Sequence, residues 1–238
     1  MAKIISVVSF KGGSGKSFFS LNLASALALQ GKETLLVDLN FSSPSLHNLL
    51  GVSSPESTLT HFVKGFETAE SIVFMHPSGM KVVFGDPAFG FTLVNSIHRI
   101  KKLLLNLFNK FDFIILDTAP SFSEGAKPAF SLSEFSIGVS LPFMYSLEPT
   151  LKCLNLLKGQ GSKVLGFVFN QCRRHSSELT SRSVPAFSSF PLLASIGYDE
   201  EVYTSEKKHH PLVYINKKSE VSITLSGLAS TLSGRTLR

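Results

Sequence analysis

The chain has 238 residues, of which 43% are hydrophobic and 17% charged, so its composition is that of a globular protein and excludes a disordered one. Its two cysteines, Cys153 and Cys172, form no C-x-x-C pair, which excludes a cysteine-based metal or redox motif and is typical of a reducing compartment. The formal net charge of +6 favours contact with nucleic acid or anionic lipid, although a solvated, lysine-rich surface has the same composition.

Two further features of the sequence bear on its location. The N-terminal segment lacks a signal-cleavage pattern, and no apolar run approaches the roughly 20 residues that span a bilayer. We therefore expect a cytoplasmic protein, either free or associated with the nucleoid or the membrane.

Apolar patterns alternate between strand and helix along the whole chain. In chain order they predict a strand over 3–9, a helix over 17–30, a strand over 33–39, short helices over 45–50 and 58–64, a strand over 81–84, a helix over 94–108, strands over 111–117 and 135–140, a helix over 147–157, strands over 163–170 and 190–195, and a last helix over 219–232. Segments 85–91 and 173–189 carry the weakest patterns.

This alternation predicts an α/β fold with a mostly parallel, twisted sheet and helices on both faces. Ligands of such sheets bind at the carboxyl ends of the strands. Phe10, Asp38, Asp117 and Asn170 follow or end predicted strands, so we expect them along one rim of the sheet.

A glycine-rich loop joins the first predicted strand to the first predicted helix and reads Lys11-Gly12-Gly13-Ser14-Gly15-Lys16-Ser17. Glycines allow a tight turn in which successive backbone N–H groups face phosphate oxygens, and the start of a helix adds the positive end of its dipole. At this spacing Lys16 reaches the β- and γ-phosphates, and the Ser17 hydroxyl is a ligand for Mg²⁺. The loop predicts a site for ATP and Mg²⁺; a lysine-rich turn without a ligand is the alternative.

The loop departs from the common pattern G-x-x-x-x-G-K-[ST] because position 10 is Phe, and Lys11 and Gly12 instead match K-G-G-x-G-K-[ST]. This form resembles the deviant Walker loop of the ParA/MinD family, and MinD-like members most closely. The resemblance continues through the family's second strand, its Walker B strand with switch II and its adenine-reading strand, at residues 31–38, 111–120 and 163–170. It implies a P-loop NTPase formed by a single domain over residues 1–238.

The resemblance also implies roles for individual residues. Lys11 matches the family's signature lysine, which crosses an ATP-dependent homodimer to the partner's nucleotide; a solvated loop lysine is the alternative. Asp117 would hold Mg²⁺ through water, beside Ser17 and Asp38, where switch I begins. Asn170 would read the adenine edge, although Asn after a strand is also ordinary in turns. The expected nucleotide-binding residues are Gly12, Gly13, Ser14, Gly15, Lys16, Ser17, Phe18 and Asn170, and the expected catalytic residues are Lys11, Lys16, Asp38 and Asn40.

Two residues depart from the family's pattern. The family has D-x-D after the second strand, whereas this chain has Asp38-Leu39-Asn40. An amide can hydrogen-bond the attacking water but cannot accept its proton, so we expect tight ATP binding with slow or absent hydrolysis. Phe18 stands where many relatives have a Thr that touches the α-phosphate.

Three functions are compatible with these residues. The first is a nucleotide switch that positions or partitions a cellular cargo or apparatus, acting through an activating protein partner and either nonspecific DNA or a membrane surface. We favour DNA or a protein scaffold, because the segment 228–238 resembles the last core helix and not an amphipathic anchor. The second is a scaffold for pilus or flagellum assembly that hydrolyses little ATP. The third is a kinase or cofactor-assembly enzyme on the same fold, for which the chain lacks clustered tyrosines and suitably spaced cysteines.

Overall fold

The computed structural model describes residues 2–41, 43–86, 97–120 and 131–234. Within these ranges eight strands form one sheet in the order β3-β4-β2-β5-β1-β6-β7-β8, in which only the β3–β4 pair is antiparallel. The strands are β1 (Lys3–Val8), β2 (Thr34–Leu39), β3 (Val73–Met75), β4 (Lys81–Val83), β5 (Phe113–Thr118), β6 (Phe135–Ser140), β7 (Lys163–Cys172) and β8 (Leu192–Gly197). The helices are α1 (Lys16–Leu29), α2 (Leu46–Leu49), α3 (Leu59–Lys64), α4 (Ile97–Leu107), α6 (Met144–Gly159), α7 (Glu201–Lys207), α8 (Leu212–Ile215) and α9 (Glu220–Gly234).

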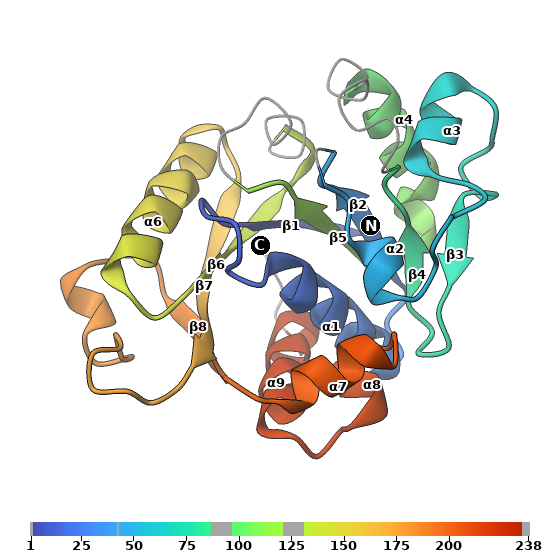
Figure 1. The fold of residues 1–238 in the computed structure, drawn as a ribbon. Helices are drawn as coiled ribbons and strands as arrows, with labels where there is room; N and C mark the ends of the chain where they lie inside the picture. The colour runs from blue at the N-terminus through green and yellow to red at the C-terminus, as the bar shows by residue number, and fades with distance from the viewer. Residues whose placement is uncertain (1, 42, 87–96, 121–130, 235–238) are drawn as a thin grey trace.

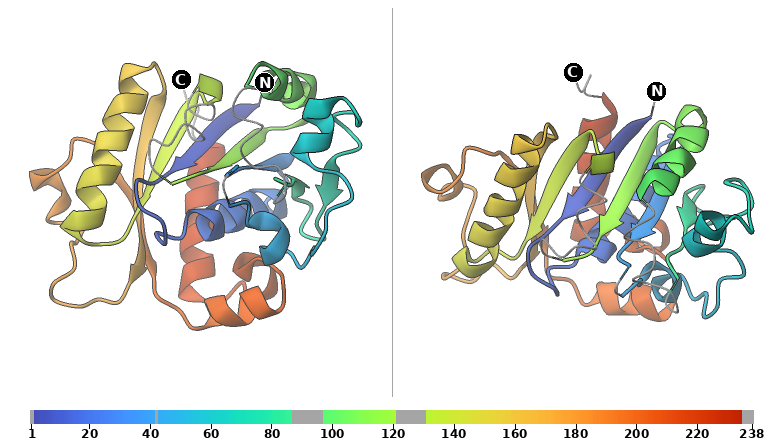
Figure 2. Two further views of the ribbon diagram at one scale, coloured as in Figure 1. Left: turned by 45° about the horizontal axis from the view of Figure 1, so that its top comes forward. Right: turned by 90° about the horizontal axis from the view of Figure 1, so that it is seen from above.

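Helices cover both faces of the sheet (Figures 1 and 2). The central strand β5 shows why, since side chains alternate between the two faces of a strand. Ile115 packs into the apolar cluster formed with α1 and α9, whereas Ile114 and Leu116 pack into the cluster formed with α3 and α4. Both faces of this strand are therefore apolar, as the sequence predicts for a buried parallel strand.

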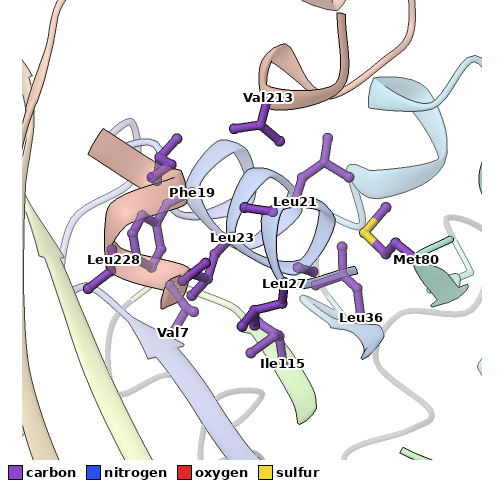
Figure 3. Close-up of a cluster of buried hydrophobic side chains, with 14 of the residues drawn as sticks. Val7, Phe19, Leu21, Leu23, Leu27, Leu36, Met80, Ile115, Val213 and Leu228 are labelled. Atoms are coloured by element: carbon purple, nitrogen blue, oxygen red, sulfur yellow. The ribbon is translucent and has the colours of Figure 1, made fainter. Parts of the chain in front are cut away.

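Helix α1 lies at the centre of the larger cluster (Figure 3). Phe19, Leu23 and Leu27 recur at helical spacing and are fully buried between the sheet and α9. Because replacing a buried leucine by alanine costs about 2–5 kcal/mol, this packing holds the start of α1 firmly against β1. The loop between β1 and α1 is thus fixed at both ends.

The parallel register brings the carboxyl ends of three strands to one edge of the sheet. Asp117 of β5 is paired with Val7 of β1 and with Asp38 of β2. The expectation that the strand ends share one rim is confirmed for these strands.

The mostly parallel sheet, its strands and its principal helices are confirmed, with three differences. The first is β3, whose three residues are too few for a recognisable pattern. The others are α7 and α8, which were not predicted. α7 reads Glu-Val-Tyr-Thr-Ser-Glu-Lys and packs against the larger apolar cluster through Val202, which is too little for an apolar stripe that the sequence would reveal. Helix α4 begins at Ile97, and the predicted start at 94–96 lies outside the described residues.

A pair of histidines joins the turn after β3 to the segment before α8. The Nε2 of His76 lies 3.0 Å from the Nδ1 of His210, and the Nδ1 of His76 lies 2.9 Å from the Ser78 hydroxyl. The Tyr214 ring meets His76 edge-on at 5.3 Å. Burial, assisted by the nearby His210, lowers the pKa of His76 to about 4.

This histidine makes stability depend on pH. Between about pH 6.5 and 4 the unfolded chain protonates His76 while the folded chain does not, so the free energy of unfolding falls as the pH falls through this window. We expect His76→Gln to lose less stability than the unsubstituted protein between pH 7 and pH 5, as measured by urea midpoints. His98→Gln, an exposed position on α4, is the control. An equal loss in the His76 and control variants would contradict this assignment.

Candidate functional site

The predicted phosphate loop is a closed turn held by its own side chains. Gly13 and Gly15 have φ of 78° and 84°, in the left-handed region that favours glycine. The buried Ser14 hydroxyl donates to the Ser9 hydroxyl at 2.7 Å, which in turn donates to the Lys11 carbonyl at 2.8 Å. These two hydrogen bonds and the two glycines define the path of the loop backbone.

A cavity of about 520 Å³ opens beside this loop. It is lined by Gly12, Gly13, Gly15, Lys16, Ser17 and Phe18, and by Asn40, Ser43 and Ser45 of the loop that follows β2. A cavity of this size, at the first residues of a helix and beside a glycine-rich loop, suits a polyphosphate.

Lys16 supplies a cation to the cavity. Its side chain is largely buried, and the loss of hydration lowers its pKa, a shift that the carboxylate of Asp117 partly opposes. A buried ammonium gains from a partner of opposite charge, so the position of Lys16 fits the predicted contact with phosphate oxygens, which stays a prediction.

Asp117 is the site's candidate for holding a metal ion. The side chain is 0% exposed, and its Oδ1 accepts a hydrogen bond from the Ser20 hydroxyl at 3.1 Å. Its Oδ2 is buried and accepts no hydrogen bond of ordinary geometry from the described residues. Burial raises the pKa of Asp117, against the effects of Ser17 and Lys16. An unsatisfied buried carboxylate oxygen near a serine hydroxyl fits a site for Mg²⁺ or its bound water.

Asp38, which pairs with Asp117 across the sheet, binds backbone N–H groups through both of its carboxylate oxygens. Its Oδ1 accepts the Asn40 N–H at 3.0 Å, and its Oδ2 accepts the N–H groups of Ser45 and Leu46 at 3.0 and 3.2 Å. Burial and the adjacent Asp117 raise the pKa of Asp38 to about 7, although these three N–H groups oppose the shift. Asp38 therefore ties down the loop after β2, and its predicted role as a catalytic residue and metal ligand stays a prediction.

The loop tied by Asp38 carries Asn40 to the cavity wall. The Asn40 amide nitrogen donates to the Ser43 carbonyl at 2.7 Å, which orients the side chain. The position expected to face the attacking water thus lines the cavity, with an amide where a carboxylate would be the proton acceptor.

A second cavity of about 160 Å³ adjoins the first and shares Gly15, Phe18 and Glu206 with it. Asn170 lines it, and its Nδ2 donates to the Ser14 carbonyl at 2.9 Å. A Cβ on Gly15 would come within 2.1 Å of that nitrogen, so glycine is required there. The amide oxygen of Asn170 takes no part in this bond and is suited to accept a hydrogen bond from a nucleotide base.

Sequence reasoning missed the other side of this smaller cavity. Tyr198, Asp199 and Tyr203 line it from the end of β8 and from α7. The two tyrosine rings meet at 6.4 Å, and the Arg173 guanidinium lies 3.8 Å from the Tyr198 ring centroid. No motif marks these residues; a correct prediction of α7 would have brought them to the site.

Comparison with known proteins agrees with this geometry. The model of the family described as the CobQ/CobB/MinD/ParA nucleotide binding domain matches residues 5–212. The septum site-determining protein MinD of Synechocystis sp. is 25% identical over 99% of this chain and 91% of its own length. The cell division ATPase MinD of Pyrococcus furiosus superposes with a TM-score of 0.90 at 28% identity, covering 98% of this chain and 99% of the other. MinD of Pyrococcus horikoshii complexed with Mg-ADP also gives 0.90, at 27% identity and 98% and 97% coverage.

The role of Asp117 can be tested by separating magnesium from nucleotide. We expect Asp117→Asn to lower nucleotide affinity about 10- to 100-fold in Mg²⁺, the range typical of groups that orient a metal's ligands. In EDTA the substitution should change affinity little, because the nucleotide's other contacts do not use this carboxylate. Titration calorimetry in both buffers measures this; an equal loss with and without Mg²⁺ would contradict the metal role.

Proposed function

Because this chain belongs to the CobQ/CobB/MinD/ParA nucleotide-binding domain family, we propose that it is an ATP-binding switch that forms a homodimer with ATP and hydrolyses it slowly. The observation that carries the proposal is that two buried groups lie near each other at one rim: the ammonium of Lys16, and Asp117 with its unsatisfied carboxylate oxygen. Its proposed cellular task is to position or partition a cargo or an apparatus, with a protein partner as activator.

The residues around the two cavities have separate roles in binding and hydrolysing ATP. The loop N–H groups and Lys16 bind the phosphates, and Ser17 with Asp117 would hold Mg²⁺, which neutralises charge on the terminal phosphates when bound. Asn170 and the tyrosines of the smaller cavity bind the base. Asn40 positions the attacking water but leaves its proton without an acceptor, which makes hydrolysis slow. In the dimer, Lys11 of one copy stabilises the transferring phosphoryl group in the other.

The surface on which the switch acts is proposed to be DNA or a protein scaffold. Lys101 and Lys102 are exposed on α4, but Arg174 pairs with Glu220 at 2.9 Å and Arg173 stacks on a tyrosine. Among the described helices, none has both the length and the apolar character needed to cross a bilayer. ATP-dependent gel shifts that weaken steeply with salt would support DNA, and pelleting with anionic vesicles would support a membrane instead.

A scaffold with little hydrolysis is the second candidate, and Asn40 is the observation that favours it. It shares the nucleotide site with the switch and differs in turnover alone. A protein that dimerises in ATP but releases no phosphate, with or without its activator, would favour the scaffold.

The dimer switch is tested by the size of the protein. Sedimentation should give a dimer with Mg²⁺ and a non-hydrolysable ATP analogue and a monomer with ADP. Lys16→Ala should abolish the response because the nucleotide is no longer held. A monomer under both conditions, with nucleotide shown to be bound, would refute the switch.

The effect of Asn40 on the rate of ATP hydrolysis is tested by replacing its amide with a carboxylate. We expect Asn40→Asp to raise steady-state phosphate release at least about 10-fold, the low end of what general base catalysis contributes. Asn106→Asp, an exposed position on α4, makes the same chemical change away from the cavity and should leave the rate unchanged. Equal rates in all three proteins would disprove the explanation for slow hydrolysis.

A further inference from the structure

Lys11 makes a contact outside the nucleotide site. Its Nζ lies 4.8 Å from the centroid of the Tyr145 ring, on the second residue of α6. At this distance the ammonium is attracted to the face of the ring by a cation–π interaction. The two residues come from different connections of the sheet, one after β1 and one after β6.

The aromatic platform beneath Lys11 is held in place. The Tyr145 ring stacks on Phe143 with centroids 5.5 Å apart and planes only 10° from parallel. The turn that carries both rings is fixed by the Ser146 hydroxyl, which accepts the Leu141 N–H at 3.0 Å and the Ser140 hydroxyl at 3.0 Å. The ring therefore offers a defined position to the ammonium.

This contact holds Lys11 apart from its own phosphate cavity, which its loop neighbours Gly12, Gly13 and Lys16 line and Lys11 does not. The surface around the contact is open and apolar. Tyr145 is 54% exposed, Met144 39% and Phe10 37%. A mobile lysine side chain would lose conformational entropy on binding to a second copy of the chain. A lysine side chain that already rests on an aromatic ring has lost part of this entropy before binding.

We propose that Tyr145 is a positioning residue that presents Lys11 to a second copy of this chain carrying a nucleoside triphosphate. This inference rests on the proposed dimer switch and deepens it. The ring stays under the lysine stem in the dimer, where exclusion of water strengthens the contact. Each dimer uses two such lysines, so the effect of the ring on presenting one lysine enters the dimer dissociation constant squared.

The test measures the dimer dissociation constant by sedimentation with Mg²⁺ and a non-hydrolysable ATP analogue. Tyr145→Leu should raise this constant about 5- to 30-fold, which is the square of a factor of about 2.3–5.4 for each of the two lysines. Tyr145→Phe keeps a ring and should change it by less than about 5-fold. Tyr145→Gln repeats the ring deletion with a polar side chain in case the leucine variant aggregates. The affinity of each monomer for nucleotide should not change.

Two controls separate positioning from a general effect on structure. Phe66→Leu removes a 73% exposed ring after α3, at the opposite end of the sheet from α6, and should leave dimerisation unchanged (Figure 1). In a double-mutant cycle, Tyr145→Leu should have no effect once Lys11→Ala is present, because the ring acts through the lysine.

The outcomes distinguish this inference from the proposed function. A monomer in the unsubstituted protein would overturn the switch itself. A dimer that Tyr145→Leu leaves unchanged, or tightens, would overturn the positioning role alone, as would an equal effect of Tyr145→Leu with and without Lys11.

Discussion

Two carboxylates buried side by side set the chemistry of this molecule. Asp38 and Asp117 occupy paired positions of β2 and β5, and Lys16 is buried close enough for its charge to act on Asp117. Burial raises the pKa of both carboxyls and lowers that of Lys16, so it disfavours the charged form of all three groups. A polyphosphate beside Lys16 and a divalent cation beside Asp117 would supply the counter-charges that water supplies elsewhere.

The two buried carboxylates differ in how many of their oxygens accept hydrogen bonds. Asp38 satisfies both of its oxygens with backbone N–H groups, and in doing so it fixes the path of the loop that carries Asn40. Asp117 keeps one oxygen unsatisfied and available to a ligand. Removing either charge would therefore have different consequences: the loss of Asp38 would release the loop that carries Asn40, and the loss of Asp117 would remove the unsatisfied oxygen that the proposed metal site depends on.

The sequence was sufficient for the parts of the site that local chemistry dictates. The glycines, Lys16 and Ser17 are adjacent in the chain, and apolar runs end at Asp38 and Asp117, so pattern alone placed them on one rim. The sequence was insufficient for the parts of the site that depend on packing between segments far apart in the chain. Tyr203 lines the smaller cavity, together with Phe18 of α1, because the unpredicted α7 carries it there, and Tyr145 meets Lys11 because β6 pairs with β1. Neither contact corresponds to a residue spacing that could be recognised in the sequence.

The contrast between the two lysines of the loop follows from the turn itself. Gly13 and Gly15 adopt positive φ, and the turn that they form leaves Lys16 buried at the wall of the larger cavity and Lys11 outside it, against α6. If both ammonium groups lined one cavity, a single chain could neutralise its own nucleotide and a second copy would add little. With Lys11 held outside, each chain has a binding cation but lacks the second charge, which favours a site completed by another molecule. Under the proposed function, the same separation implies that replacing Lys11 or Tyr145 weakens assembly and leaves nucleotide binding intact, whereas replacing Lys16 removes nucleotide binding and assembly with it.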